Sequence, residues 1–196
     1  EICDPNDPRT PDEQFKHFTD ECHKRGLHVV MDVVFNHVYD SDVFPLSILV
    51  PGYTYHTKKD GFMSNSSGCG NDVNSTKLMV RRYIIDVLTY YKTELNVDGF
   101  RFDLMGLMDI ETVKLIVKIA EEVNDNILIY GEPWRGGASP LENGIYKGLQ
   151  KNQGFSVFND TFRDFIRGNN SPSNGFVNGN QHDGLTAWNI IEGLKG

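Results

Sequence analysis

The stretch VDGFRFDLMG, residues 97–106, decides the fold prediction because it combines the pattern of a buried β-strand with two charged residues. Side chains alternate between the faces of a strand, so Arg101 and Asp103 share one face while Phe100 and Phe102 share the other. Charged side chains are rarely buried unless they are paired or take part in function. The stretch therefore predicts either a structural ion pair or part of an active site.

Patterns before this stretch predict a helix followed by a strand. Thr10 is a suitable N-cap, with Pro11 in the first turn, Glu13 completing a capping box and Gly26 ending the helix. The segment LHVVMDVVF, residues 27–35, is apolar on both faces. Such a run is typical of a parallel strand that other layers cover on both sides.

The remaining elements continue the alternation of helices and strands. The first helix is expected to bury a stripe formed by Phe15, Phe18 and Cys22. Further along the chain we expect helices over about 76–95 and 110–123, the second capped by Asp109, strands at ILIYGE (127–132) and within FSVFND, and a short helix at GLTAWNIIEGL. This order predicts an α/β fold with parallel strand pairing.

Two α/β architectures compete for this pattern. A doubly wound sheet would need a glycine-rich turn after its first strand, and none of these strands has one. A (β/α)8 TIM barrel carries functional polar residues at the C-terminal ends of successive strands. Asn36 and His37 follow the first predicted strand, Asp103 the second and Glu132 the third. The sequence therefore predicts an incomplete barrel, about strands 3 to 6 with their helices, in which residues 1–196 are one internal fragment of a single domain with a long βα loop at 36–75.

Composition narrows the classes of partner. The 196 residues suffice for one domain, and 19 basic against 27 acidic residues give a formal net charge of −8. An acidic chain without a basic run argues against nucleic acid and anionic membrane surfaces as partners, and no apolar run is long enough to span a bilayer. Cys3, Cys22 and Cys69 have the spacing of neither a zinc site nor a disulfide framework. The compartment of the protein is left open.

Asp103 and Glu132 form a candidate catalytic pair. Adjacent strands lie about 4.8 Å apart, which is close to the roughly 5 to 5.5 Å between the carboxyl groups of retaining glycosidases. One carboxylate would attack the anomeric carbon while the other protonates the leaving oxygen. Arg101 favours the ionised, nucleophilic form of Asp103, whereas the aromatic and proline residues around Glu132 predict an apolar setting that favours its protonated form.

Each of these residues also has a purely structural interpretation. Arg101 and Asp103 could form an ordinary ion pair, Asp32 could be a buried carboxylate satisfied by a neighbouring strand, and His37 could be a satisfied polar group. The functional interpretation is favoured by the occurrence, in order, of DVVFNH, GFRFDLM and GEPW on three successive predicted strands.

These three segments resemble the first, second and third signature regions of the α-amylase superfamily, glycoside hydrolase family 13. Within that superfamily the chain is similar to the type I pullulanases, which debranch starch and pullulan. The similarity rests on DVVFNHVYDSD, VPGYTYHTKKDGFMSNSSGCGND, VDGFRFDLMG and LIYGEPWRGG, which together span most of residues 27–137.

The resemblance implies a role for each candidate residue. Asp103 would be the nucleophile, Glu132 the general acid/base and Arg101 the residue that orients Asp103. The residues implied to line or support the site are Asp32, Asn36, His37, Asn71 and Trp134. The implied reaction is retaining hydrolysis of α-1,6 branch linkages in an α-glucan, without an organic cofactor. Calcium is common in the wider family, but the sequence shows no clear site for it.

Alternatives and one departure from the family remain. An isoamylase- or neopullulanase-type activity, or a non-catalytic α-glucan-binding protein on the same scaffold, is also compatible with the resemblance, although the presence of both Asp103 and Glu132 argues against lost catalysis. Active family members carry a third carboxylate, an Asp preceded by His, on a later strand. His182 and Asp183 match those residue types but lie in a Gly/Asn-rich loop with no strand before it. We therefore expect the third carboxylate beyond Gly196 and expect this 196-residue piece alone to be inactive.

Overall fold

The computed structural model describes residues 3–123, 127–169 and 174–195. It forms two compact units, Glu1–Val157 and Phe158–Gly196, which are described separately. The elements of the first unit are α1 (Pro11–His23), β1 (Val30–Val33), α2 (Pro45–Leu49), α3 (Leu78–Thr93), β2 (Gly99–Phe102), the 3-10 helix η1 (Met105–Leu107), α4 (Ile110–Val123), β3 (Leu128–Gly131) and β4 (Ser156–Val157). The second unit contains α5 (Asp160–Arg167), the 3-10 helix η2 (Phe176–Asn178) and α6 (Gly184–Lys195). The expectation of a single domain over residues 1–196 stays a prediction.

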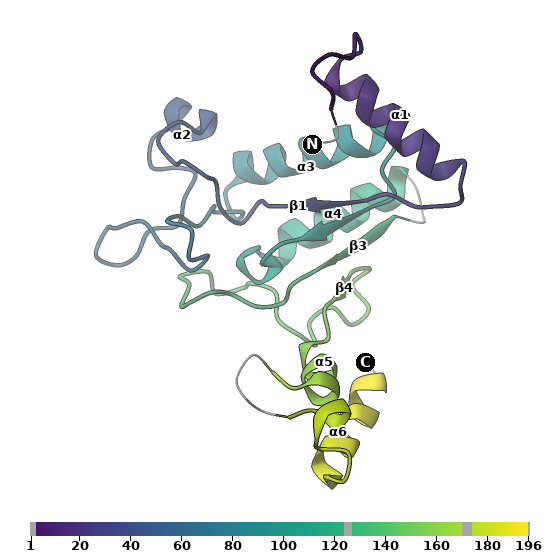
Figure 1. Ribbon diagram of the computed structural model, residues 1–196. Coiled ribbons are helices and arrows are strands. Elements are labelled where there is room, and N and C mark those ends of the chain that lie inside the picture. The colour runs from purple at the N-terminus through teal and green to yellow at the C-terminus, as the bar shows by residue number, and fades with distance from the viewer. Residues whose placement is uncertain (1–2, 124–126, 170–173, 196) are drawn as a thin grey trace. The chain divides into compact units, whose positions relative to one another are not determined.

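The first unit is built on one parallel sheet with the strand order β1-β2-β3-β4 (Figure 1). In its register Asp32 lies opposite Arg101, and Arg101 lies opposite Tyr130. The predicted α/β fold with parallel pairing is thereby confirmed. The strands are shorter than the apolar runs that predicted them, because the chain leaves the ladder at both ends to enter loops.

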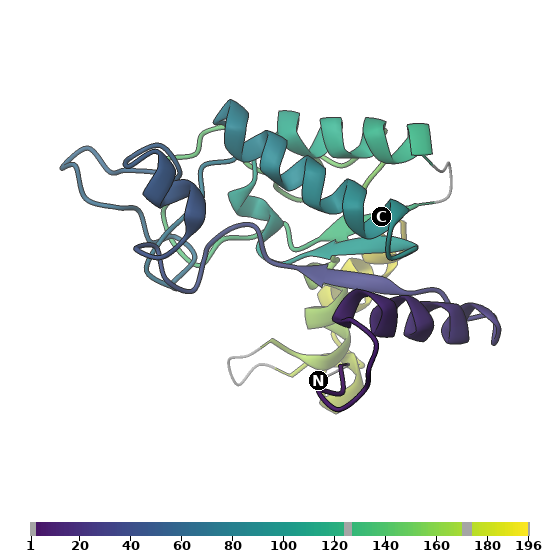
Figure 2. The same ribbon diagram turned by 90° about the horizontal axis from the view of Figure 1, so that it is seen from above.

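Helices α3 and α4 cover one face of the sheet, as Figures 1 and 2 show. Phe100 and Phe102 point into this layer and are almost completely buried, at 1% and 0% exposure. They pack in a core with residues of both helices, including Val80, Ile84, Leu88, Val113 and Ile116. The burial removes large aromatic surfaces from water, which is the main favourable contribution to folding. The two faces predicted for VDGFRFDLMG are therefore observed.

The opposite face of the sheet differs from the sequence expectation for residues 27–35. Val34 is 49% exposed and Leu128 is 48% exposed, and Asp32 lies on this same face with an exposed side chain. Within the described residues this face of the strand is therefore uncovered, and coverage on both sides stays a prediction for the full-length protein. The run of valines could not reveal this, because an apolar sequence shows what a strand is able to bury and not what packs on it.

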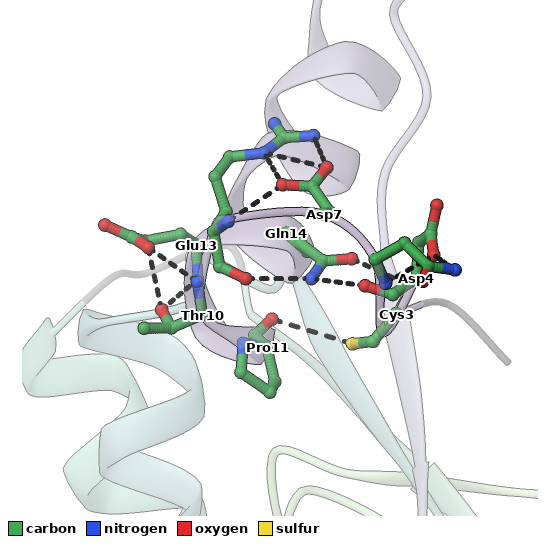
Figure 3. Close-up of polar contacts among 9 residues, drawn as sticks. Cys3, Asp4, Asp7, Thr10, Pro11, Glu13 and Gln14 are labelled. Carbon is green, nitrogen blue, oxygen red and sulfur yellow. Dashed lines mark hydrogen bonds and ion pairs between the residues drawn. The ribbon is translucent and has the colours of Figure 1, made fainter.

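Helix α1 begins as the sequence predicts. The side chain of Thr10 accepts a hydrogen bond from the amide of Glu13, and Glu13 accepts one from the amide of Thr10, with Pro11 at the first position (Figure 3). These hydrogen bonds from Thr10 lower the pKa of Glu13. Gly26 follows the helix with φ 70°, a conformation that glycine adopts without a steric penalty.

The apolar stripe expected on α1 is confirmed only in part, because Phe15 is partly buried and packs against the core. The buried positions are Gln14 and Thr19, whereas Phe18 is 41% exposed. Gln14 is buried because its amide group accepts a hydrogen bond from the amide of Asp4 and donates to the carbonyls of Asp4 and Arg9 (Figure 3). The N-terminal segment thus folds back over the start of the helix, an arrangement that helical periodicity does not encode.

Most other predicted elements are present, and two α-helices were missed. Helices α3 and α4, strands β3 and β4 and helix α6 lie at their expected places, and Asp109 caps α4 by accepting a hydrogen bond from Thr112. Helix α2 lies inside the long loop, and α5 was not predicted. The signal for α5 is present in the sequence, because Asn159 caps it by accepting a hydrogen bond from the amide of Phe162.

Candidate active site

Asp103 and Glu132 lie at the C-terminal ends of neighbouring strands. The amide of Asp103 donates to the carbonyl of Val33 at 3.1 Å, and the amide of Glu132 donates to the carbonyl of Phe102 at 3.1 Å. Both residues therefore continue the ladder one step beyond the named strands, because Phe102 is paired with Gly131 in the last regular position. The structure brings the two predicted carboxylates to the same edge of the sheet.

Arg101 connects the acidic residues of this edge. Its Nη1 atom lies 2.8 Å from Oδ1 of Asp32 and 3.1 Å from Oδ1 of Asp103. Its Nη2 atom lies 2.6 Å from Oε1 of Glu132. Burial lowers the pKa of Arg101, but its hydrogen bonds and attraction to these carboxylates outweigh this effect and raise the pKa above its ordinary value. The guanidinium stays charged and holds two candidate catalytic groups at once.

Asn36 holds Asp103 from the side of β1. Its Nδ2 atom donates to Oδ2 of Asp103 at 3.1 Å and to the carbonyl of the same residue at 2.7 Å. Asn36 is 1% exposed, so these bonds are made in a shielded position. Its Oδ1 atom lies 2.6 Å from Nδ1 of His37, and because an amide oxygen only accepts, Nδ1 carries the hydrogen. His37, Asn36 and Asp103 therefore form one hydrogen-bonded chain.

The surroundings of Glu132 differ from the apolar setting that its sequence neighbours predicted. One carboxylate oxygen pairs with Arg101, and the other accepts a hydrogen bond from the amide of Leu104 at 3.0 Å. Both carboxylate oxygens of Glu132 are therefore occupied by polar donors. The difference arises because Arg101 belongs to the adjacent strand and reaches Glu132 across the ladder. Residues next to Glu132 in sequence gave no sign of this contact.

Asp32 supports the site from an exposed position. Its side chain is 66% exposed, so Asp32 is not a buried carboxylate, although its partner does lie on the neighbouring strand as that interpretation expected. It contacts Arg101 because the register places the two residues opposite each other on the same face. An ion pair this exposed is screened by solvent and contributes little to stability. What it contributes is a further acceptor that orients the guanidinium.

Asn71 ties the long loop to the end of β1. Its amide oxygen accepts a hydrogen bond from the amide of Val38 at 2.9 Å, and its Nδ2 atom donates to the carbonyl of Val38 at 2.8 Å. The amide of Val73 donates to the carbonyl of Asn36 at 2.9 Å. The loop is therefore fastened directly beside the residue that holds Asp103.

The segment that carries Trp134 packs closely against η1. A Cβ atom added to Gly106 would lie 2.4 Å from the backbone oxygen of Trp134, so only glycine fits at this position. Arg135 strengthens the contact by donating from Nε to the carbonyl of Gly106 at 2.9 Å. Trp134 itself is partly buried. Gly106 thus permits the segment that follows Glu132 to lie against the segment that follows Asp103.

Asp72 organises the part of the loop that flanks this segment, a feature that the sequence analysis did not single out. Its carboxylate accepts hydrogen bonds from the amides of Ser66 at 2.7 Å and Ser67 at 2.8 Å. Burial raises the pKa of Asp72, but hydrogen bonds from Ser64, Ser66 and Ser67 outweigh it and leave the pKa below its ordinary value. Ser66 in turn donates to the carbonyl of Ala138 at 2.6 Å. The signal in the sequence is the SNSSGCGND segment, which is rich in residues that form polar turns.

Asp183, the residue compared above with a third carboxylate, caps a helix in the second unit. Its Oδ2 atom accepts hydrogen bonds from the amide of Thr186 at 2.7 Å and from the hydroxyl of Thr186 at 2.6 Å. These bonds lower the pKa of Asp183. The environment is that of an N-cap at the start of α6.

Neither a metal-binding cluster nor a membrane-spanning helix is found among the described residues. Within residues 3–123, 127–169 and 174–195, no cluster of three or more His, Cys, Asp or Glu side chains is arranged to hold a metal ion. None of the helices in the same ranges has both the length and the apolar character needed to cross a bilayer.

Comparison with known proteins extends this description. No protein-family model matches the chain. It is 39% identical to a pullulanase of Bacillus subtilis strain 168 over 197 residues, which cover 98% of this chain and 27% of that protein. It is 42% identical to the chloroplastic isoamylase 1 of Oryza sativa subsp. japonica over 99 residues, or 48% of this chain and 12% of that one.

A solved structure agrees with these matches. The crystal structure of a pullulanase from Anoxybacillus sp. LM18-11, complexed with maltotetraose, superposes on this chain with a TM-score of 0.90 at 35% identity. The match covers 100% of this chain and 29% of that one. The chain spans about a quarter of the length of the pullulanases named here. Along nearly its whole length, this chain is a homologue of the pullulanases, and over a shorter part it is a homologue of the isoamylases.

Proposed function

We propose that this chain forms part of a retaining glycoside hydrolase that cleaves α-1,6 branch linkages in α-glucans such as pullulan, starch and glycogen. The observation that carries the proposal is the contact of one guanidinium, that of Arg101, with both Asp103 and Glu132. A pair of carboxylates held this close together, at the ends of adjacent parallel strands, suits double displacement at an anomeric carbon. The homology to pullulanases supports α-glucans as the substrate class.

In the proposed first step, an oxygen of Asp103 attacks the anomeric carbon and Glu132 gives a proton to the glycosidic oxygen. The bond between the anomeric carbon and that oxygen breaks, and its electron pair goes to the departing sugar. In the second step Glu132 takes a proton from water, and the water oxygen displaces Asp103 from the anomeric carbon. Two inversions at one carbon give net retention.

The contacts of the free protein suit Asp103 for its role. Arg101 and Asn36 each donate to the carboxylate of Asp103, so the orientation of the nucleophile is defined. Glu132 has to carry a proton when the first step begins. Because Arg101 and the amide of Leu104 each donate to one of its oxygens, we expect bound substrate to draw one oxygen of Glu132 away from these donors.

The other candidate residues have supporting roles in this proposal. His37 and Trp134 would contact the sugar, Asn36 and Asp32 would orient the charged groups, and Asn71 would place the long loop at the edge of the site. Related pullulanase structures hold maltose and maltotetraose, which supports an α-glucan as the ligand. No residue in this scheme requires an organic cofactor.

The proposed architecture is part of a (β/α)8 barrel, about strands 3 to 6. Four parallel strands in sequence order, with helices α3 and α4 packed on one face, support this assignment. The third acidic residue of such a site would come from outside these 196 residues, because Asp183 serves as a helix cap.

An isoamylase-type activity is the second candidate, because the rice isoamylase aligns with about half of the chain. The two activities are distinguished by comparing the hydrolysis of pullulan with that of glycogen. A non-catalytic α-glucan-binding protein on the same scaffold is the third alternative, and it is tested by activity itself.

The test uses the full-length protein with Asp103→Asn and Glu132→Gln. Each variant should lower turnover of pullulan by on the order of 10³-fold or more, while binding of the glucan is largely kept. Asp86→Asn is the matched control, because Asp86 is exposed on α3 and pairs with Arg82. Turnover close to that of the unmodified protein in either catalytic variant would overturn the assignment.

A further inference from the structure

Leu104, directly after the proposed nucleophile, adopts a left-handed backbone conformation with φ 38° and ψ 49°. Two other non-glycine residues in the described ranges have positive φ, Asn96 at 55° and Asn152 at 59°. Asparagine is several-fold enriched in this region because its short polar side chain tolerates it, whereas leucine pays a steric penalty there. Leu104 is therefore the unusual member of the three. Strained backbone of this kind persists where the surrounding structure imposes it.

The surrounding structure holds this conformation in place. The carbonyl of Leu104 accepts a hydrogen bond from the amide of Leu107 at 2.9 Å, and the carbonyl of Met105 accepts one from the amide of Met108 at 2.9 Å. Met105, Leu107 and Met108 are buried, with exposures of 0%, 2% and 1%. The side chain of Leu104 is itself only partly buried. Burial of Met105, Leu107 and Met108 thus stabilises the turn, whereas Leu104 contributes its left-handed backbone conformation.

The turn holds Glu132 at two points. The amide of Leu104 donates to Oε2 of Glu132 at 3.0 Å, and the amide of Gly106 donates to the backbone carbonyl of Glu132 at 2.9 Å. The φ and ψ angles of Leu104, together with those of Met105, lie between these two amides along the chain, so the left-handed conformation of Leu104 contributes directly to their relative orientation. An extended residue at this position would direct the second amide elsewhere.

We propose that Leu104 is a positioning residue whose left-handed backbone aims two amides at Glu132 and so fixes the carboxylate beside Asp103. The proposal rests on the proposed function, because it assigns a purpose to the placement of Glu132. The amide that holds the Glu132 carboxylate belongs to the peptide bond between Asp103 and Leu104. A change in the turn would therefore move Glu132 relative to Asp103. Displacement of a catalytic group by about 1 Å can cost on the order of 100-fold in rate.

The test compares substitutions at Leu104 by how well each new residue accepts the left-handed conformation. Leu104→Val, which is β-branched and disfavours that conformation, should lower kcat on pullulan by on the order of 10- to 100-fold with little change in KM. Leu104→Asn and Leu104→Gly accept it and should lose much less. Leu104→Ala disfavours the left-handed conformation less than valine does and replaces the valine variant if that variant does not fold. Its kcat should lie between that of Leu104→Val and those of Leu104→Asn and Leu104→Gly.

Asn152→Val is the matched control. It places the same residue type at another left-handed position, in the loop before β4 and outside the candidate site. It should lower the melting temperature without changing kcat. The two valine variants are compared at an equal change in melting temperature. If Leu104→Val then loses more kcat than Asn152→Val, the loss reflects the positioning of Glu132 and not general stability.

The outcomes separate this proposal from the proposed function. Glu132→Gln is measured in the same assay, and if it retains full turnover, the proposed function and this inference fall together. If Glu132→Gln is inactive while folded Leu104→Val or Leu104→Ala retains full kcat, the function stands and the positioning role is wrong. If the order is reversed, so that valine is tolerated and asparagine and glycine are not, the side chain of Leu104 matters and the backbone explanation is wrong.

Discussion

Arg101 and Glu132 lie on adjacent strands, and their side chains meet with an Nη2–Oε1 distance of 2.6 Å. Both side chains are largely shielded, at 18% and 17% exposure. The pair is shorter than the contact between Arg101 and its near neighbour Asp103, which measures 3.1 Å. The charged pair that marks the strand in the sequence is therefore one half of a bridge between two strands, and its distance is the longer of the two. This bridge joins Glu132 to a residue 31 positions away in the sequence.

Removal of the Arg101 charge should destabilise the protein in a pH-dependent way. Arg101→Met leaves Asp32, Asp103 and Glu132 clustered without their shared cation, and like charges at short range repel. The loss of stability should be largest near pH 7 and should shrink as the pH falls toward 4, because protonation of the carboxylates relieves the repulsion. Thermal unfolding of the full-length protein from pH 4 to 8 measures this. Arg82→Met, which removes an exposed arginine from α3, serves as the control. A pH-independent loss would contradict the explanation.

Truncation of Asn36 should weaken both the fold and the site. Asn36→Ala removes two hydrogen bonds to Asp103. The backbone carbonyl of Asp103 then lacks this donor in a shielded position. We expect a loss of about 1–3 kcal/mol in the free energy of unfolding and a fall in kcat, because Asp103 loses a group that orients it. Urea unfolding and turnover on pullulan measure the two effects. Asn189→Ala on α6, where the side chain bonds the carbonyl of Leu185, is a suitable comparison. An unchanged kcat in Asn36→Ala would show that Arg101 alone orients the carboxylate.

Gly106 should tolerate no side chain. In Gly106→Ala the new Cβ atom would lie 2.4 Å from the backbone oxygen of Trp134, so the segment after Glu132 has to move. We expect a loss of about 1–3 kcal/mol of stability, as for other overpacked positions, together with reduced turnover. Gly137→Ala is the control, because its Cβ would meet only the Cα atom of Ser66 at 3.9 Å, an ordinary contact. Equal effects of the two substitutions on melting temperature and kcat would contradict the steric argument.

His56 should make the stability of the long loop fall in mild acid. Burial lowers the pKa of His56, and attraction to Asp72 and Asp109 offsets this only in part. Its Nε2 atom is buried and has no hydrogen-bond partner among the described residues. The folded pKa lies below the unfolded value, so the unfolded chain binds more protons between the two values. Stability is therefore complete above the unfolded pKa of about 6.5 and is lost as the pH falls from there toward the folded pKa.

The measurement for His56 is the melting temperature of the full-length protein between pH 7.5 and 5. His56→Gln, which does not titrate, should flatten the decline over this range. His28→Gln is the comparison, because His28 is exposed at the start of the β1 segment. An identical decline in the His56→Gln variant would place the titrating group elsewhere.

Local rules explain the parts of the structure that the sequence predicted. A capping box needs residues three positions apart, so Thr10 and Glu13 marked the start of α1 correctly. Strand alternation has a period of two, so the buried face of Phe100 and Phe102 was evident before any partner was known. The positions of Asp103 and Glu132 followed from where the predicted strands end. These interactions all act within a few residues.

The amino-acid sequence by itself determined the α/β alternation, the strand faces and the two carboxylates at the ends of β2 and β3. Only the tertiary structure decided that Asp32 is exposed, that Glu132 is held by Arg101 and a backbone amide, and that Leu104 is left-handed. The physical reason is the range of the interactions. Capping and alternation are local, whereas an ion pair across strands depends on register, and a strained turn depends on packing around it.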